Sequence, residues 1–161
     1  MMFHTTAKFP LLKILEQNHK VILSEYLASA DKLKPYFETH LHNGKWEAYG
    51  IKFKGEDIEN NCPKTTELVN QIPRTYIAGF STLKAGCEIR PHTGYTGDVW
   101  RAHLGLICPD NCWIKVGDEK HTWKEGEVVV FDDTIRHEAK NESDTDRVIL
   151  LVDFYKEGKS D

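Results

Sequence analysis

The sequence lacks any long hydrophobic run. A transmembrane helix needs about 20 consecutive apolar residues, and no segment of the 161-residue chain approaches that length. The apolar stretch that starts at Pro10 is interrupted by Lys13, too early for the hydrophobic region of a signal peptide. We therefore expect no membrane insertion and a cytoplasmic location.

An excess of positive charge is also absent. The formal net charge is −4, and the Lys and Arg residues are scattered among Asp and Glu. Proteins that bind nucleic acid usually gather their basic residues into a patch or stripe. We therefore expect no nucleic-acid partner.

Cysteine is scarce and its spacing is uninformative. Of the four cysteines, Cys62 and Cys87 stand alone. Three residues separate Cys108 from Cys112, but no second Cys or His pair completes a zinc site. We expect reduced thiols in the core rather than a disulfide or zinc framework.

The chain divides into two unlike parts. Its length and a hydrophobic fraction of 40% fit one compact domain over residues 1–161. Residues 1–38 show helical spacing of apolar residues, first from Leu11 to Leu15 and then from Val21 to Leu27. This pattern predicts two amphipathic helices before a β-rich core over residues 45–156.

The core is predicted from short apolar or alternating runs separated by Gly, Asn and Asp. These runs cover residues 46–53, 75–80, 100–107, 113–116, 128–131 and 148–154. Short strands without intervening helices favour an antiparallel sandwich, barrel or jelly roll over a parallel α/β sheet. We expect a mainly β fold with the two N-terminal helices packed on one sheet. The polar segment 54–70 is predicted to be a loop that could cover the mouth of the barrel.

Histidines supply the first candidate chemistry. His92, His103, His121 and His137 fall among the predicted strands and turns, and a jelly roll could bring His137 beside His92. Non-haem iron(II) suits imidazole and carboxylate ligands. The usual iron triad has a carboxylate two residues after its first His, but Gly94 stands there. From the spacing alone, a surface or hydrogen-bonded core role remains open for each His, and His121 is expected to be superficial.

Several motifs in the second half carry a family resemblance. They are IRPHTG at 89–94, RAHLGL at 101–106, TWKEG at 122–126 and FDDTIRHEA at 131–139, followed by Arg147 and the VDF of 152–154. Together, over about residues 77–155, they resemble the catalytic domain of aspartyl/asparaginyl β-hydroxylases. The resemblance implies a double-stranded β-helix, which is a cupin-like jelly roll, and the use of iron(II), 2-oxoglutarate and dioxygen. Animal members of that family also have Gly two residues after their first iron-binding His.

The resemblance assigns His92 and His137 as catalytic iron ligands. It assigns Arg147 and Ser81 to the distal carboxylate of 2-oxoglutarate, which a guanidinium can pair through two hydrogen bonds. The competing interpretation for Arg147 is a surface ion pair with Asp144, Asp146 or Glu142. Ser81 could instead cap a turn.

Arg101 and His103 are two residues apart on one predicted strand and therefore share a face. The resemblance assigns both to the 2-oxoglutarate carboxylate near the metal. Alternatively, both could line the solvent-exposed face of an edge strand. For Asp133 we expect a structural role, either in turn hydrogen bonding with Asp132 or in orienting His137, rather than direct iron ligation.

The resemblance implies an iron(II)- and 2-oxoglutarate-dependent dioxygenase that hydroxylates an unactivated C–H bond. The first candidate substrate is the β-carbon of an Asp or Asn residue in a peptide or protein. A free or carrier-linked amino acid and a lipid acyl group are alternatives. A halogenase with chloride in the place left by Gly94, or a non-catalytic jelly-roll binding module, also remains open. The sequence does not predict the oligomeric state.

Overall fold

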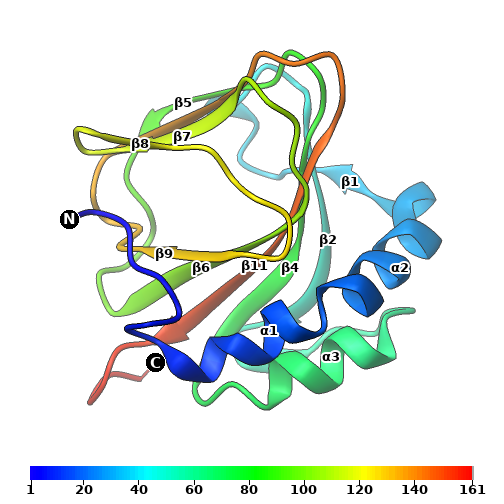
Figure 1. The fold of residues 1–161 in the computed structure, drawn as a ribbon, viewed down its shortest axis with the longest axis vertical. Coiled ribbons are helices and arrows are strands. Elements are labelled where there is room, and N and C mark those ends of the chain that lie inside the picture. The colour runs from blue at the N-terminus through cyan, green and yellow to red at the C-terminus, as the bar shows by residue number, and fades with distance from the viewer. Residues whose placement is uncertain (161) are drawn as a thin grey trace.

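Two antiparallel sheets face each other and form a jelly roll in the computed structural model, which describes residues 1–160 (Figure 1). The seven-stranded sheet has the order β1-β2-β4-β11-β6-β9, with β3 paired to β2, and the four-stranded sheet has the order β5-β10-β7-β8. The larger sheet consists of β1 (Lys34–Pro35), β2 (Trp46–Phe53), β3 (Glu56–Asp57), β4 (Thr75–Leu83), β6 (Val99–Ile107), β9 (Val128–Phe131) and β11 (Arg147–Tyr155). The smaller sheet consists of β5 (Glu88–His92), β7 (Cys112–Val116), β8 (Glu119–His121) and β10 (His137–Asn141).

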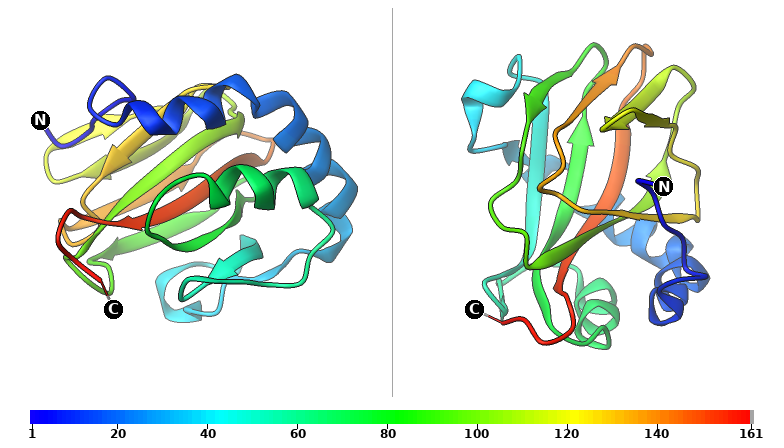
Figure 2. Two further views of the ribbon diagram at one scale, coloured as in Figure 1. Left: turned by 90° about the horizontal axis from the view of Figure 1, so that it is seen from below. Right: turned by 90° about the vertical axis from the view of Figure 1, so that its left-hand side faces the viewer.

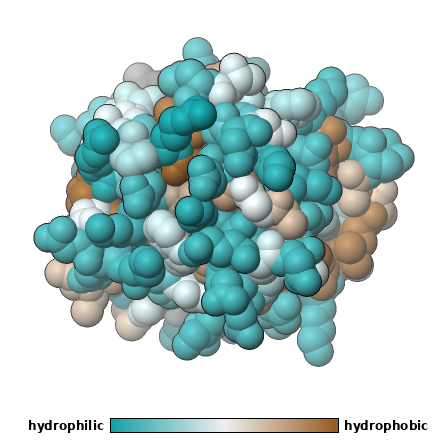
Figure 3. All heavy atoms as spheres, turned by 90° about the horizontal axis from the view of Figure 1, so that it is seen from above, coloured by the Kyte–Doolittle hydropathy of each residue, from teal (hydrophilic) through white to brown (hydrophobic). Residues whose placement is uncertain are grey.

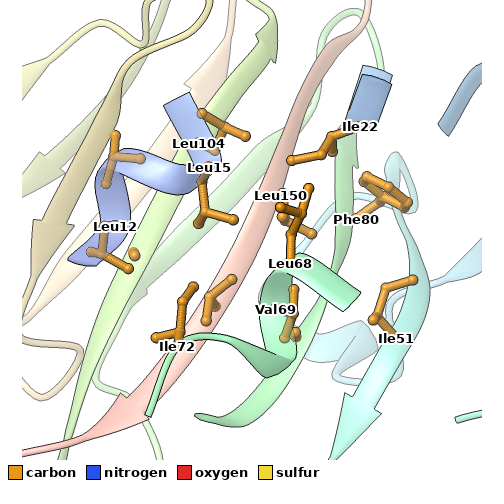
Figure 4. Packing of buried hydrophobic residues seen from close by; sticks show 14 of the residues in the cluster. Leu12, Leu15, Ile22, Ile51, Leu68, Val69, Ile72, Phe80, Leu104 and Leu150 are labelled. Atoms are coloured by element: carbon orange, nitrogen blue, oxygen red, sulfur yellow. The ribbon is translucent and has the colours of Figure 1, made fainter. Parts of the chain in front are cut away.

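Three helices cover the outer face of the larger sheet (Figures 1 and 2). They are α1 (Lys13–Gln17), α2 (His19–Ser29) and α3 (Pro63–Asn70), and short 3-10 helices occupy Pro10–Leu12, Ala30–Lys32 and Thr39–Leu41. Figure 4 shows how Leu15, Ile22 and Val69 of the helices meet Phe80 and Leu150 of the sheet. Burial of these side chains is the main force that fixes the helices on the sheet.

A second apolar core lies between the two sheets. Because side chains alternate along a strand, β4 and β11 present Phe80 and Leu150 to the helices, whereas Leu83 and Ile149 belong to the core between the sheets. Ser81 and Arg147 have the same phase as this inner set. The alternation therefore places these polar side chains inside the barrel.

The predicted mainly β jelly roll with two N-terminal helices is confirmed. Strands occur at all six predicted positions, and β2 and β9 have the predicted bounds. None of the six predicted apolar runs covers β5 or β10, which carry His92 and His137. Both strands mix polar and apolar residues. In β5 only one residue is fully buried, and in β10 buried residues alternate with partly buried ones. Pro91 weakens the strand signal of β5 further.

The prediction of a loop over residues 54–70 is wrong for its second half. Pro63–Asn70 forms α3, which buries Leu68 and Val69 against the core under the helices. The carboxylate of Glu25 on α2 accepts hydrogen bonds from the backbone N–H groups of Lys64 (3.0 Å) and Thr65 (2.7 Å). This N-terminal cap comes from a distant residue, so the local sequence gives no capping signal.

The helices of the described chain are short. Within residues 1–160, no helix has the length and apolar content needed to cross a membrane.

Candidate active site

His92 and His137 lie side by side on neighbouring strands. They are register partners in the pairing of β5 with β10, and their ring centroids are 4.4 Å apart. The Nδ1 atoms lie 2.7 Å from the carbonyl oxygens of Arg90 and Ile135, respectively. A carbonyl can only accept, so each Nδ1 donates, and in the neutral imidazole the lone pair is then on Nε2, where it can bind a metal. Burial lowers the pKa of His92, which favours the neutral, ligating form.

Asp133 is completely buried beside this pair. Its Oδ1 atom accepts a hydrogen bond from Arg101 Nη1 (2.9 Å) and lies 3.2 Å from His137 Nε2. Burial alone would raise the pKa of Asp133, but the charge of Arg101 and the contact with His137 outweigh it and hold the pKa below its usual value. Asp133 therefore places a carboxylate charge against the two histidines.

Gly94 is required by the position of Asp133. A Cβ atom at residue 94 would overlap with the Asp133 carboxylate, and the Gly94 N–H donates to the Asp133 carbonyl (2.7 Å). The space that a side chain at residue 94 would occupy is thus filled by Asp133. The turn itself is held by Asp132, whose Oδ1 accepts from the Thr134 N–H (2.9 Å).

The surroundings of the histidines fit a metal cation. An unprotonated Nε2 and a carboxylate oxygen both accept hydrogen bonds, so at 3.2 Å they need a cation or proton between them. The second oxygen of Asp133, Oδ2, is buried with no hydrogen-bond partner. Within residues 1–160, no group of three or more His, Cys, Asp or Glu side chains is arranged to hold a metal. The side chains therefore fit a metal site with two imidazole ligands and the Asp133 carboxylate nearby.

Arg147 is buried in the same barrel, and no acidic side chain of the described residues forms an ion pair with it. It is 2% exposed, its Nη2 donates to the carbonyl and hydroxyl oxygens of Ser81 (both 3.0 Å), and its Nε has no partner among residues 1–160. The guanidinium carbon lies 4.3 Å from the ring centroid of Trp123. Asp146, which could have formed a surface ion pair with Arg147, pairs with Lys84 instead (3.0 Å).

The groups around Arg147 leave its charge uncompensated. Burial raises the pKa of Cys87 and Cys112 to about 11 and that of Cys108 to about 12, so all three are neutral thiols at neutral pH. Burial also lowers the pKa of Arg147 to about 10, well above neutral pH. A buried and unpaired cation is costly, and a bound anion would offset that cost.

The Ser81 hydroxyl has its proton available for a ligand. Its oxygen accepts from Trp46 Nε1 (2.9 Å) and from Arg147 Nη2 (3.0 Å). Because both lone pairs are used, the O–H of Ser81 is left to donate. Sequence reasoning missed Trp46. Trp46 lies on the same face of β2 as Ala48 and Gly50, because side chains alternate along a strand, and this alternation could have placed it inside the barrel.

His103 is a neutral donor. Its Nδ1 accepts from Trp123 Nε1 (3.1 Å), which leaves its proton on Nε2. Burial, followed by the charges of Arg147 and Arg101, holds its pKa well below the usual value.

Arg101 joins two buried carboxylates. Its Nε and Nη2 donate to Asp153 (2.8 and 2.9 Å), and its Nη1 donates to Asp133. Both Arg101 and His103 therefore face the interior and not the solvent. His121 lies apart on β8, half-buried against Phe3.

Structural comparison supports the jelly-roll description. A prolyl-4-hydroxylase from Pseudomonas putida is similar with a TM-score of 0.62 at 17% identity, covering 89% of this chain and 88% of that chain. A 2OG-Fe(II) oxygenase-family oxidoreductase from Burkholderia pseudomallei has a TM-score of 0.60 at 12% identity, covering 86% and 79%. At these identities the likeness shows a shared fold.

Sequence comparison gives the family. The human aspartyl/asparaginyl beta-hydroxylase is 36% identical over 93% of this chain, and an ornithine lipid ester-linked acyl 2-hydroxylase from Rhizobium tropici is 33% identical over 98%. The aligned region spans 22% of the human protein and 61% of the R. tropici protein. The family model described as Aspartyl/Asparaginyl beta-hydroxylase matches residues 16–157. The chain therefore belongs to the aspartyl/asparaginyl β-hydroxylase family.

Proposed function

We propose that this chain is an iron(II)- and 2-oxoglutarate-dependent oxygenase that hydroxylates an unactivated C–H bond. The observation that carries the proposal is the buried and unpaired guanidinium of Arg147, in the same barrel as the His92–His137 pair. A dicarboxylate with a 2-oxo group would fit this interior, because one carboxylate would neutralise Arg147 and the other would bind the metal. Family membership and the jelly-roll fold support the same chemistry.

The protein side chains would hold the reactants as follows. Nε2 of His92 and of His137 would ligate iron(II), with the Asp133 carboxylate beside it. Arg147 and the Ser81 hydroxyl would bind the distal carboxylate of 2-oxoglutarate, and the Nε2–H of His103 would donate to the carboxylate near the metal.

When bound, iron with 2-oxoglutarate and dioxygen supplies the oxidant for the C–H bond. The protein orients the target carbon and keeps water from the interior. Arg101 positions Asp133 through their 2.9 Å ion pair and has donor hydrogens left for the cosubstrate. The single-domain organisation, the cytoplasmic location and the roles of these residues remain predictions.

Hydroxylation is favoured over halogenation by the contents of the space at Gly94. A halogenase would need chloride there, but the Asp133 carboxylate fills that space, and two anions at one position repel each other. A non-catalytic binding module is disfavoured because the metal-facing and carboxylate-facing groups are both complete.

The substrate class is a further part of the proposal. The β-carbon of Asp or Asn, which the family name suggests, remains a prediction. The R. tropici relative is named for hydroxylation of an acyl group, and the lining of the large pocket described below favours that second candidate.

Formation of succinate from 2-oxoglutarate tests the proposal before the substrate is known. We expect iron(II)-dependent succinate formation by the wild type, its loss in His137→Ala, and a sharp reduction in Arg147→Ala. Arg74→Ala, at an exposed position that is none of the proposed site residues, is a matched control that should retain turnover. Unchanged turnover in His137→Ala or Arg147→Ala would overturn the assignment.

A further inference from the structure

A pocket of about 490 Å³ begins at Ser81 and Arg101 and continues along the larger sheet. Its floor crosses three strands, because Gly79 pairs with Gly50 on one side and with Leu151 on the other. Ala48, the register partner of Ser81, also lines it. Ala48, Gly50 and Gly79 are small, and the Ile58 side chain packs against Gly50. The volume is in the range of ordinary small-molecule sites.

The walls of this pocket are mainly aromatic. Tyr36 packs on Trp46 with ring centroids 3.7 Å apart, and Tyr76 stacks with Tyr95 at 6.3 Å. All four line the pocket together with Ile77. A ligand in the pocket would therefore meet apolar surface along most of its length, which suits hydrocarbon and offers few partners for polar groups.

The inner end offers little attraction for a substrate carboxylate. Arg101 is the cation at this end, and its charge is already shared by Asp133 and Asp153, at 2.9 and 2.8 Å. Because the remaining donors of Arg101 are proposed to hold the cosubstrate, the carboxylate of a substrate Asp residue would be a further anion around one guanidinium. Lys52, farther along the pocket, is paired with Asp57 (2.9 Å). The pocket therefore discriminates against an acidic side chain at its inner end.

The exposed part of the pocket lining combines apolar side chains with lysines. Seven large hydrophobic residues are exposed in the described chain, and four of them line this pocket. The four are Phe37 (80%), Phe53 (51%), Tyr95 (51%) and Ile58 (39%). Such clustering marks a surface that contacts an apolar partner. By contrast, the face of the molecule seen in Figure 3 is mainly hydrophilic, with apolar side chains in smaller patches.

The charges at this rim favour an anionic head group. Lys34 and Lys54 are exposed and line the pocket, and no ion pair of the described residues involves either of them. The acidic lining residue, Glu38, accepts a hydrogen bond from the Tyr36 hydroxyl (3.0 Å). The accessible charge at the mouth is therefore predominantly positive.

From these features we infer that the pocket takes the acyl chain of an anionic amphiphile, with the chain on the Gly50–Gly79–Leu151 floor and the head group near Lys34 and Lys54. The inference rests on the proposed oxygenase function, since the chain would present its C–H bonds to the site at Ser81 and Arg101. It replaces the Asp or Asn side chain with a hydrocarbon substrate.

Calorimetric titration of the purified protein with octanoate, decanoate and dodecanoate, below their micelle concentrations, tests the inference without turnover. We expect the affinity to rise about threefold to fourfold for each added CH₂ group, and to level off when the chain fills the pocket. Dodecyltrimethylammonium, with the same chain and a cationic head, should bind more weakly. A short peptide that contains Asp and Asn should not compete.

Variants locate the binding. Ala48→Phe should abolish dodecanoate binding by filling the floor, and Phe37→Ser with Phe53→Ser should weaken it about tenfold or more by removing contact area. Leu27→Ser, at a residue of α2 that is 58% exposed and outside the pocket, is the matched control and should bind like the wild type. Unfolding curves check that the Ala48→Phe protein is folded, and the rim variants provide an independent test if it is not.

Other outcomes separate this inference from the proposed function. No dependence on chain length, an equal effect of Leu27→Ser, or binding of the peptide in place of dodecanoate would overturn the acyl-chain inference, while succinate formation by the wild type would still support the oxygenase. Dodecanoate binding in a protein that forms no succinate would refute the proposed function, and with it the role of the chain as substrate.

Discussion

Replacement of Arg147 by Met tests the buried charge at the centre of the proposed cosubstrate site. The guanidinium is 2% exposed, and burial lowers its pKa from the ordinary arginine value to about 10. Each pKa unit corresponds to about 1.4 kcal/mol, so the charge costs the folded protein about 3 kcal/mol at neutral pH. The unfolded state binds this proton more tightly, so the cost is complete below about pH 10 and falls as the pH rises above about 10 towards the ordinary pKa of arginine.

The hydrogen bonds of Arg147 recover only part of that cost. Its two bonds to Ser81 contribute about 1 kcal/mol each. An unbranched apolar side chain removes both the cost and the bonds while it fills similar space. We therefore expect Arg147→Met to unfold with the same free energy as the wild type in the absence of ligand, or about 1 kcal/mol higher.

Binding of 2-oxoglutarate should respond in the opposite direction. Loss of two charge-assisted hydrogen bonds to the distal carboxylate removes about 3 kcal/mol or more of binding free energy, which raises the Kd about a hundredfold or more. Denaturant unfolding of iron(II)-loaded protein under anaerobic conditions, with and without 2-oxoglutarate, measures both effects. Stabilisation of wild type and variant by the same amount, or a ligand-free variant several kcal/mol less stable than the wild type, would refute the reasoning.

Three further substitutions probe the metal side and the fold. Asp133→Asn should weaken iron(II) binding about tenfold or more in equilibrium dialysis, and an unchanged affinity would show that this carboxylate does not support the metal. Gly94→Ala should destabilise the protein by about 1–3 kcal/mol, because its Cβ would overlap with Asp133, whereas at Gly97 the nearest atom is 3.6 Å away; equal unfolding midpoints for Gly94→Ala and Gly97→Ala would contradict this packing. Glu25→Gln should cost about 1 kcal/mol by weakening the cap of α3, and protease sensitivity in the region of α3 should rise; unchanged sensitivity there would contradict the role of Glu25 as the cap.

The sequence predicts best those strands that contribute side chains both to the core under the helices and to the core between the sheets. Strands β4 and β11 bury side chains on both faces and are strongly apolar, so their sequences identify them. Strands β5 and β10 expose one face and carry polar or charged residues, so the same criteria do not detect them. Helix α3 was missed because its cap comes from Glu25, 39 residues before Lys64.

The candidate site shows the same division between local and long-range information. The sequence singled out His92, His137 and Arg147 because each lies in or beside one of the motifs that carry the family resemblance. The hydrogen bond of Trp46 to Ser81 spans 35 residues, and that of Arg101 to Asp153 spans 52. Such partners are set by strand register, which an individual motif does not encode.

The pocket illustrates what small residues can indicate once register is known. Ala48 and Gly50 have the same phase on β2, and Gly79 faces Gly50 across the strand pair. Each is an ordinary strand or turn residue in the sequence. Only their register alignment shows that they leave one continuous space beside Ser81.

The most direct test of the proposed function is anaerobic spectroscopic titration of the iron(II)-loaded protein with 2-oxoglutarate. A 2-oxo acid chelated to iron(II) gives a visible charge-transfer absorption, so the signal reports the metal and the cosubstrate together. We predict that the absorption appears in the wild type, is lost in His137→Ala, and requires a much higher 2-oxoglutarate concentration in Arg147→Met. No absorption in the wild type, or an unchanged titration in His137→Ala, would contradict the assignment of this site.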